Sequence, residues 1–192
     1  MALNLLLYPG PADRRYTDPL ALPIFTDQRP PRRAAGRVDW RRGGLLSRWL
    51  EDHPWRESDF HLIHHPGQAF ASLLLRPCGS FEELSGQRIV TIIADLTATL
   101  ARAGAGRFSL ALLDLFPEDY AIRDFAEDVF EGLVKGLAGP WAAKVEMIRL
   151  LWREQDAEPL LRELRRFRHH LERPESWEVS LDPDSSPPAR SE

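Results

Sequence analysis

The sequence predicts an α/β fold in which a mixed, mostly parallel sheet lies between layers of helices. Apolar strand-like runs alternate with amphipathic helical segments along most of the chain, an order typical of parallel sheets covered by helices. The run Phe108–Leu115 is continuously apolar, as expected of a central strand covered on both faces. The segment Asp119–Leu137 has a gapless apolar stripe at helical spacing, which predicts a helix packed against that sheet.

Each predicted element depends on its own pattern. Short apolar runs bounded by Gly, Pro or polar residues indicate strands, and apolar residues at helical spacing indicate helices. Pro23 lies inside one strand-like run, so we expect that strand at a sheet edge or a bulge, because proline donates no N–H. In chain order, strands are expected over residues 3–8, 20–26, 60–65, 69–76, 108–115 and 145–152, a loop over residues 28–36, and helices over residues 39–51, 85–103, 119–137 and 156–171.

The composition changes after Arg173. The residues that follow are acidic and rich in Pro and Ser, which is typical of segments that cannot bury enough apolar surface to pack. We therefore expect a domain over residues 1–172 and a flexible tail over residues 173–192.

Length and composition exclude several classes of protein. The single cysteine, Cys78, excludes a disulfide framework and a cysteine-based zinc site. The net charge of −4 argues against a general polyanion binder. The opening MALNLLLYPG has no basic residue, and no segment has the roughly 20 apolar residues of a membrane span. We therefore expect a cytoplasmic protein with no membrane partner.

Three stretches resemble the N-terminal domain of the leucine aminopeptidases. They are LALPIFTDQRPPRRAAGRVDWRRGGLLSRWLE (20–51), LLLRPCGSFEELSGQRIVTIIADLTATLARAGAGRFSLALL (73–113) and AIRDFAEDVFEGL (121–133). In that family a strand with an acidic turn leads to an aspartate, a glycine pair and a Leu-Ser helix. The matching positions are Asp27, Asp39, Gly43-Gly44 and Leu46-Ser47. The resemblance implies a three-layer macro-like fold, because that domain is related to the macro domains.

The resemblance also bears on catalysis. In the aminopeptidases a second domain holds two zinc ions on lysine, aspartate and glutamate ligands, and no stretch of this chain resembles it. We therefore expect no peptidase activity, no catalytic residue, no bound metal and no cofactor.

A candidate ligand site follows from the same resemblance. In macro domains the glycine-rich start of the first helix lies against the diphosphate of ADP-ribose, and the N–H groups of a helix N-terminus favour such an anion. Arg41, Arg42, Gly43 and Gly44 are therefore candidate ligand-binding residues. The alternative is that the two glycines only allow the helix to pack closely on the sheet.

The segment after the expected central strand argues against a phosphate. It has no glycine for close backbone approach, and it places Glu118 and Asp119 where a second phosphate loop would lie. Two carboxylates at that point would repel an anionic group.

Histidine and cysteine side chains suggest weaker alternatives. His61, His64 and His65 lie on one predicted strand, but a zinc site needs three or more ligands and no further partner is evident. We expect these histidines to be paired or solvated. Cys78 would need a base within reach to act as a nucleophile, and a small buried hydrophobe is the expected role.

The sequence also contains two basic clusters. One comprises Arg29, Arg32, Arg33, Arg37, Arg41 and Arg42, and the other Arg162, Arg165, Arg166, Arg168, His169 and His170. Acidic residues are interleaved and the net charge is negative, so we expect solvated or protein-contact faces rather than nucleic-acid binding. Trp40, Trp55 and Arg37 are candidate interface residues, because exposed Trp and Arg are enriched in protein interfaces.

These observations lead to two functional hypotheses. The first is a non-catalytic interaction or regulatory module that binds a protein partner or a second copy of itself. The alternative is a macro-like module that binds ADP-ribose or a related nucleotide.

Overall fold

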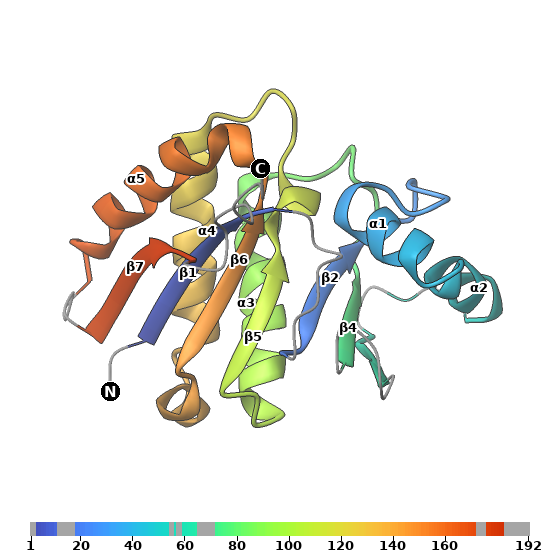
Figure 1. Cartoon of the computed structure of the whole chain (residues 1–192), viewed down its shortest axis with the longest axis horizontal. Coiled ribbons are helices and arrows are strands. Elements are labelled where there is room, and N and C mark those ends of the chain that lie inside the picture. The colour runs from blue at the N-terminus through green and yellow to red at the C-terminus, as the bar shows by residue number, and fades with distance from the viewer. Residues whose placement is uncertain are drawn as a thin grey trace, which may run out of the picture.

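The computed structural model describes residues 3–10, 18–53, 56, 59–64, 72–171 and 176–182. These residues form three layers, with a twisted sheet between two layers of helices (Figure 1). The predicted α/β class is therefore confirmed.

The described part of the chain forms a seven-stranded sheet in the order β3-β4-β2-β5-β6-β1-β7. Every neighbouring pair is parallel except β3 and β4, which are antiparallel. The strands are β1 (Leu3–Pro9), β2 (Leu20–Ile24), β3 (His61–His64), β4 (Ser72–Pro77), β5 (Arg107–Ala111), β6 (Met147–Trp152) and β7 (Trp177–Leu181). All strands but β3 therefore end at one edge, where ligands of such sheets bind.

Helices cover both faces of the sheet, but unequally. The helices are α1 (Arg33–Arg41), α2 (Leu45–Asp52), α3 (Gly86–Arg102), α4 (Ile122–Gly136) and α5 (Ala157–Arg168), with 3₁₀ turns η1 (Leu112–Leu115), η2 (Pro140–Lys144) and η3 (Glu154–Asp156). α3, α4 and α5 share the larger apolar core with one face of the sheet. α1 and α2 pack on the other face, mainly over β2 and β4.

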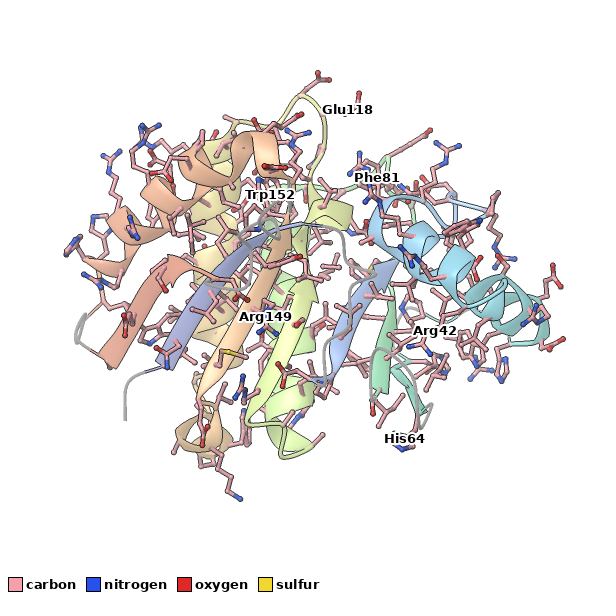
Figure 2. The ribbon with its side chains drawn as sticks, in the orientation of Figure 1. Arg42, His64, Phe81, Glu118, Arg149 and Trp152 are labelled. Carbon is pink, nitrogen blue, oxygen red and sulfur yellow. The ribbon has the colours of Figure 1, made fainter. Side chains whose placement is uncertain are left out.

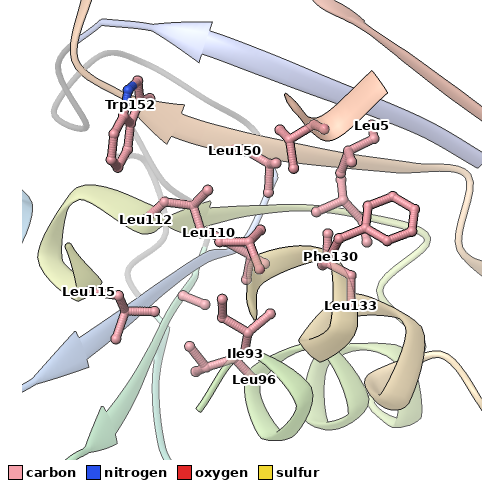
Figure 3. Close-up of a cluster of buried hydrophobic side chains, with 14 of the residues drawn as sticks. Leu5, Ile93, Leu96, Leu110, Leu112, Leu115, Phe130, Leu133, Leu150 and Trp152 are labelled. Carbon is pink, nitrogen blue, oxygen red and sulfur yellow. The ribbon is translucent and has the colours of Figure 1, made fainter. Parts of the chain in front are cut away.

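The larger core confirms the apolar stripes read from the sequence. Leu110 and Leu150 from the sheet meet Ile93 of α3 and Leu133 of α4 (Figure 3), and each is almost fully buried. Burial of such side chains stabilises the fold by about 1.5–3 kcal/mol each. α3 and α4 approach closely at Gly132, where a Cβ would lie 2.8 Å from the Cβ of Ile93.

The prediction of one helix over residues 39–51 was wrong. The segment forms two helices, and α1 begins at Arg33, inside the region expected to be a loop. Gly43 and Gly44 separate the helices with φ angles of 60° and 78°. Glycine adopts this left-handed conformation without steric cost, so the pair makes the turn that leads into α2, with Gly44 as the N-cap of that second helix.

The prediction that β2 lies at an edge or bulge was also wrong, because β2 lies between β4 and β5. Pro23 is tolerated there for a local reason. The backbone carbonyl of its neighbour Ile24 points toward β4 and accepts a hydrogen bond from the N–H of Cys78. Because the backbone groups of successive strand residues point to opposite sides, those of Pro23 point toward β5. The pairing of β2 with β5 covers only Leu20 and Ala21, and no ladder N–H is missed at Pro23.

The predicted strand over residues 108–115 is shorter in the structure. β5 ends at Ala111, and the chain turns into η1. Apolar content alone could not distinguish the strand β5 from the turn η1, since Leu112 and Leu115 are as buried as the strand residues.

The predicted tail over residues 173–192 contains a strand, so the domain boundary at residue 172 was too early. β7 pairs in parallel with β1 and forms an edge of the described sheet. Its outward carbonyls at Val179 and Trp177 accept hydrogen bonds from Arg165 and Arg168 of α5. Part of the second basic cluster therefore caps a sheet edge. Residues 183–192 lie outside the described residues.

Asp182, which follows β7, is tied to the middle of the sheet. It is buried and paired with Arg149 of β6, which also reaches Asp18 at 3.0 Å. The label of Arg149 in Figure 2 marks this position near the middle of the sheet. A buried charge is tolerated only when it is paired, so this cluster anchors the end of β7 to β6.

Candidate ligand-binding pocket

A pocket of about 600 Å³ lies where the segments that follow β2, β4 and β5 converge. Its volume is within the usual range of small-molecule sites. Figure 2 shows two of its residues, Phe81 and Glu118, beyond the carboxyl ends of the strands. The lining consists of Gln28, Arg32, Arg33, Phe81, Glu82, Leu84, Pro117, Glu118 and Asp119.

Arg33 joins three walls of this pocket. Its guanidinium donates to the carbonyls of Leu113 at 3.0 Å and Phe116 at 2.7 Å, and lies 4.7 Å from the ring centroid of Phe81. Phe81 in turn packs edge-on against buried Phe25 at 5.1 Å. Arg33 has a φ of 50°, a left-handed conformation that costs a non-glycine residue about 1–3 kcal/mol and is common at functional sites.

The N-terminus of α1 is held by Asp114 of η1. The two carboxylate oxygens accept from the backbone N–H groups of Ala34 at 2.8 Å and Ala35 at 3.0 Å. Burial raises the pKa of the Asp114 carboxyl to about 7, against the lowering effect of these hydrogen bonds and of nearby Arg33. The N–H groups that could receive a ligand anion at this helix are therefore already paired.

Asp27 holds the loop after β4 in the same manner. Its carboxylate accepts from the backbone N–H of Phe81 at 2.9 Å, that of Glu82 at 3.2 Å and the hydroxyl of Ser80 at 2.8 Å. Partial burial raises the pKa of Asp27, but these hydrogen bonds outweigh it, and the pKa lies below its ordinary value. Asp27 thereby fixes the position of the Phe81 ring over Arg33.

Asp39 holds the N-terminus of α2. Its carboxylate accepts from the backbone N–H of Leu46 at 2.7 Å and that of Ser47 at 3.1 Å, and from the Ser47 hydroxyl at 2.5 Å. Three groups of N–H donors, at the starts of α1 and α2 and in the loop after β4, are thus satisfied by the chain's own carboxylates. An anionic ligand of the pocket would have to be recognised by arginine side chains instead.

The predicted ligand residues Arg41, Arg42, Gly43 and Gly44 lie elsewhere. Arg41 is the last residue of α1 and the other three follow it, about 15 Å along the helix from Arg32, and none of them lines the pocket. Their role in ligand binding stays a prediction.

Glu118 and Asp119 do line the pocket, as their position after the central strand suggested. Two arginines that the sequence did not associate with them, Arg32 and Arg33, line the same pocket. The sequence places Arg32 and Arg33 in a basic cluster within a predicted loop over residues 28–36, and that prediction gives neither side chain a position at the sheet. Placing the helix start at Arg33 would have brought both arginines to the carboxyl edge of the sheet.

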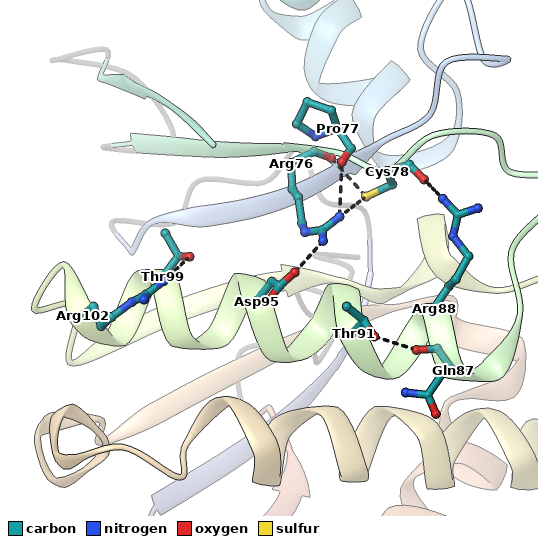
Figure 4. Close-up of polar contacts among 9 residues, drawn as sticks. All are labelled: Arg76, Pro77, Cys78, Gln87, Arg88, Thr91, Asp95, Thr99 and Arg102. Atoms are coloured by element: carbon teal, nitrogen blue, oxygen red, sulfur yellow. Dashed lines mark hydrogen bonds and ion pairs between the residues drawn. The ribbon is translucent and has the colours of Figure 1, made fainter. Parts of the chain in front are cut away.

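The environment of Cys78 confirms that it is buried. Burial raises the pKa of its thiol to about 11, which outweighs the lowering effect of Arg76. Figure 4 shows Arg76 between this thiol and Asp95 of α3. His64 contacts Ser72, the first residue of β4. Ser72 precedes Cys78 by six residues, which is roughly 20 Å along an extended strand. His64 is therefore too far away to be the base that a nucleophilic Cys78 would need.

The histidines have aromatic and polar partners. The ring of Trp49 stacks on His53 at 4.4 Å and meets His61 edge-on at 4.5 Å. His65 lies outside the described residues. Within the described part of the chain, no group of three or more His, Cys, Asp or Glu side chains could hold a metal ion.

The predicted interface residues are only partly described. Trp40 is 78% exposed and Arg37 is exposed, both on α1. Trp55 lies outside the described residues. Among the helices of the described ranges, none is long and apolar enough to cross a membrane.

Comparisons with known proteins identify the fold. No family model matches the chain, and no curated protein matches its sequence. Among solved structures, a mutant macrodomain of Oceanobacillus iheyensis is similar at a TM-score of 0.62 and 10% identity, covering 88% of this chain and 93% of that one.

Macrodomains of Trypanosoma brucei are also similar. One gives a TM-score of 0.66 at 12% identity, covering 82% of this chain and 65% of that one. Another, in complex with ADP-ribose, gives 0.65 at 13% identity, covering 81% and 66%. The leucine aminopeptidase resemblance finds no such support, whereas the macro-like architecture is confirmed. The chain has the three-layer fold of the macrodomains.

Proposed function

We propose that this protein binds ADP-ribose or a closely related nucleoside diphosphate in the pocket at the carboxyl edge of the sheet. The observation that carries the proposal is the lining itself, which combines Arg32, Arg33 and Phe81 with Glu118 and Asp119. The solved complexes of a similar macrodomain with ADP-ribose and with ADP support it.

The arginines would recognise the diphosphate. Guanidinium groups bind phosphate oxygens through paired, charge-assisted hydrogen bonds. Arg33 is already oriented by the carbonyls of Leu113 and Phe116. Arg32 is exposed, and among the described residues it has no ion-pair partner, so its guanidinium is available to a ligand.

The carboxylates and the aromatic ring would recognise the rest of the ligand. Glu118 and Asp119 can accept hydrogen bonds from ribose hydroxyls, and Phe81 offers an apolar surface to a base or a sugar. The sequence-based objection that these carboxylates repel a phosphate is weakened, because Arg32 and Arg33 share the same pocket.

We propose binding rather than bond cleavage as the activity. The described residues that line the pocket include neither histidine nor cysteine, the residues best suited to proton transfer and nucleophilic attack near neutral pH. The hypothesis of a module that binds a protein partner or a second copy of itself stays a prediction. Light scattering of the purified protein tests whether it binds a second copy.

Isothermal titration calorimetry with ADP-ribose, ADP and AMP tests the proposal. We expect ADP-ribose and ADP to bind more tightly than AMP. Arg32→Gln should weaken ADP-ribose binding by about tenfold or more, since a hydrogen bond to a charged group contributes about 1.5–3 kcal/mol.

Arg162→Gln is the matched control. Arg162 is an exposed arginine of α5 that does not line the pocket, so its loss should leave the affinity unchanged. Absence of heat at millimolar ADP-ribose, or equal effects of the two substitutions, would contradict the proposal.

A further inference from the structure

We infer that the outward face of α1 binds single-stranded nucleic acid, with a base stacked on Trp40 and phosphates on the neighbouring arginines. We define this α1 face by Arg37, Trp40 and Arg41. The three residues stand at positions i, i+3 and i+4 of the helix, so one side presents them together. All three are exposed. The inference does not depend on the pocket and goes beyond the function proposed for it.

Trp40 offers a flat ring and, among the described residues, is the one large exposed hydrophobic side chain of α1. The other large exposed hydrophobic residues of the described chain are Leu62, Val134 and Leu181, on β3, α4 and β7. A protein interface normally has a core of several apolar side chains, whereas a base needs a single aromatic face. The isolation of Trp40 therefore favours a stacked base over a protein partner.

The charge around Trp40 suits a polyanion. Residues 37–42 contain three arginines and one acidic residue, in a chain whose net charge is −4. The acidic residue, Asp39, is 8% exposed and is engaged with the N-terminus of α2. No carboxylate of α1 therefore opposes a phosphate on this face.

The arrangement of the ring and the cations is also favourable. The guanidinium of Arg41 lies 5.8 Å from the ring centroid of Trp40, and Arg37 lies about one turn away. Proteins that bind single strands combine such stacking rings with cations that follow the backbone. The net charge of the whole chain argued against nucleic acid, but it averages this basic segment with the more acidic remainder of the chain.

Fluorescence anisotropy with a labelled 12-nucleotide single strand tests the inference at low salt. We expect binding that weakens as salt increases, since bound phosphates release counterions. Trp40→Ala should lower the affinity at least fivefold, and Trp40→Phe should retain most of it, because stacking needs only an aromatic ring. Arg37→Gln should reduce the slope of log affinity against log salt by about 0.7, and Arg162→Gln should leave affinity and slope unchanged.

Several outcomes would overturn the inference. They are no binding at low salt, equal affinities of Trp40→Ala and the wild type, or displacement of the strand by polyglutamate at equal charge. Self-association that Trp40→Ala abolishes would assign the face to a second copy instead. Calorimetry of Trp40→Ala with ADP-ribose separates the two proposals, because that variant should bind the nucleotide normally.

Discussion

Asp114 accepts a hydrogen bond at 2.8 Å from the backbone N–H of Ala34, 80 residues earlier in the chain. This contact fixes the first turn of α1 against η1, and it does so beside Arg33, whose strained backbone orients a pocket side chain. The helix start and the end of the central strand are therefore parts of one structural unit.

Removing this carboxylate should destabilise the protein. Asp114→Ala leaves the buried N–H groups of Ala34 and Ala35 without acceptors, which costs about 1–3 kcal/mol. Urea denaturation at about pH 6 measures the change in the free energy of unfolding. Glu146→Ala, at an exposed position, is the control and should stay within about 0.5 kcal/mol of the wild type. Equal stabilities of the two variants would contradict the role of Asp114.

The same carboxyl predicts a pH dependence. Its pKa is about 7 in the folded protein, where burial is the main cause, against an ordinary value of 3.8. The folded state therefore holds this proton more tightly than the unfolded state. The resulting stabilisation is fully present below about pH 4 and is lost as the pH rises through about 7.

Urea denaturation of the wild type and Asp114→Ala at several pH values checks this. The wild type's advantage in the free energy of unfolding should narrow between about pH 5 and pH 8. An advantage that stays constant or grows over that interval would show that Asp114 is ionised throughout.

Asp27 should control the order of the pocket wall. Asp27→Asn turns one acceptor into a donor that faces the N–H groups of Phe81 and Glu82. Loss of a hydrogen bond of about 1 kcal/mol corresponds to roughly fivefold faster amide exchange through local opening. Hydrogen exchange of residues 80–82 measures this, with the α3 amides as the internal reference. Unchanged exchange in the loop would contradict the argument.

The contact between α3 and α4 should not tolerate a larger residue at position 132. In Gly132→Ala the added Cβ would lie 2.8 Å from both the Cβ of Ile93 and the carbonyl oxygen of Val90. Overpacking of this kind costs about 1–3 kcal/mol, and thermal unfolding should show a lower Tm. Val134→Ala, two residues further on the exposed side of α4, should change the Tm much less.

The β7 edge should become a pairing site when its arginine caps are removed. Arg165 and Arg168 donate to outward carbonyls of the strand, and open edges promote association between chains. We expect Arg165→Gln/Arg168→Gln to form more dimer or aggregate in size-exclusion chromatography with light scattering. The matched control is Arg162→Gln/Arg166→Gln on the same helix. Identical profiles of the two double variants would refute this role.

Strong periodicity made α3 and α4 predictable. The helix expected over residues 85–103 is α3 within one residue at each end, because its apolar side chains recur on one face and glycines follow it. The stripe predicted for α4 is buried from Phe125 to Leu133, but Val134, which the stripe included, is 37% exposed. Such patterns are local, so the sequence contains them in full.

The sequence-based predictions were wrong where contacts between residues far apart in the sequence decide the structure. α1 has no local N-cap side chain, and its first N–H groups depend on Asp114, which sequence neighbours cannot reveal. β7 is a short strand in a polar, proline-rich context, and it forms because β1 offers it a parallel partner. Pro23 is compatible with the sheet interior only because β5 has turned away at that point.

By itself, the sequence determined the α/β class, the main helices and the buried strands, because side-chain periodicity specifies which faces must leave water. The tertiary structure decided which residues meet at the carboxyl edge of the sheet. The pocket combines Arg33, Phe81 and Glu118 from three separate connections, and Asp27, Asp39 and Asp114 pair with N–H groups that the sequence left open to a ligand. Spatial convergence of this kind depends on strand order, which no local pattern encodes.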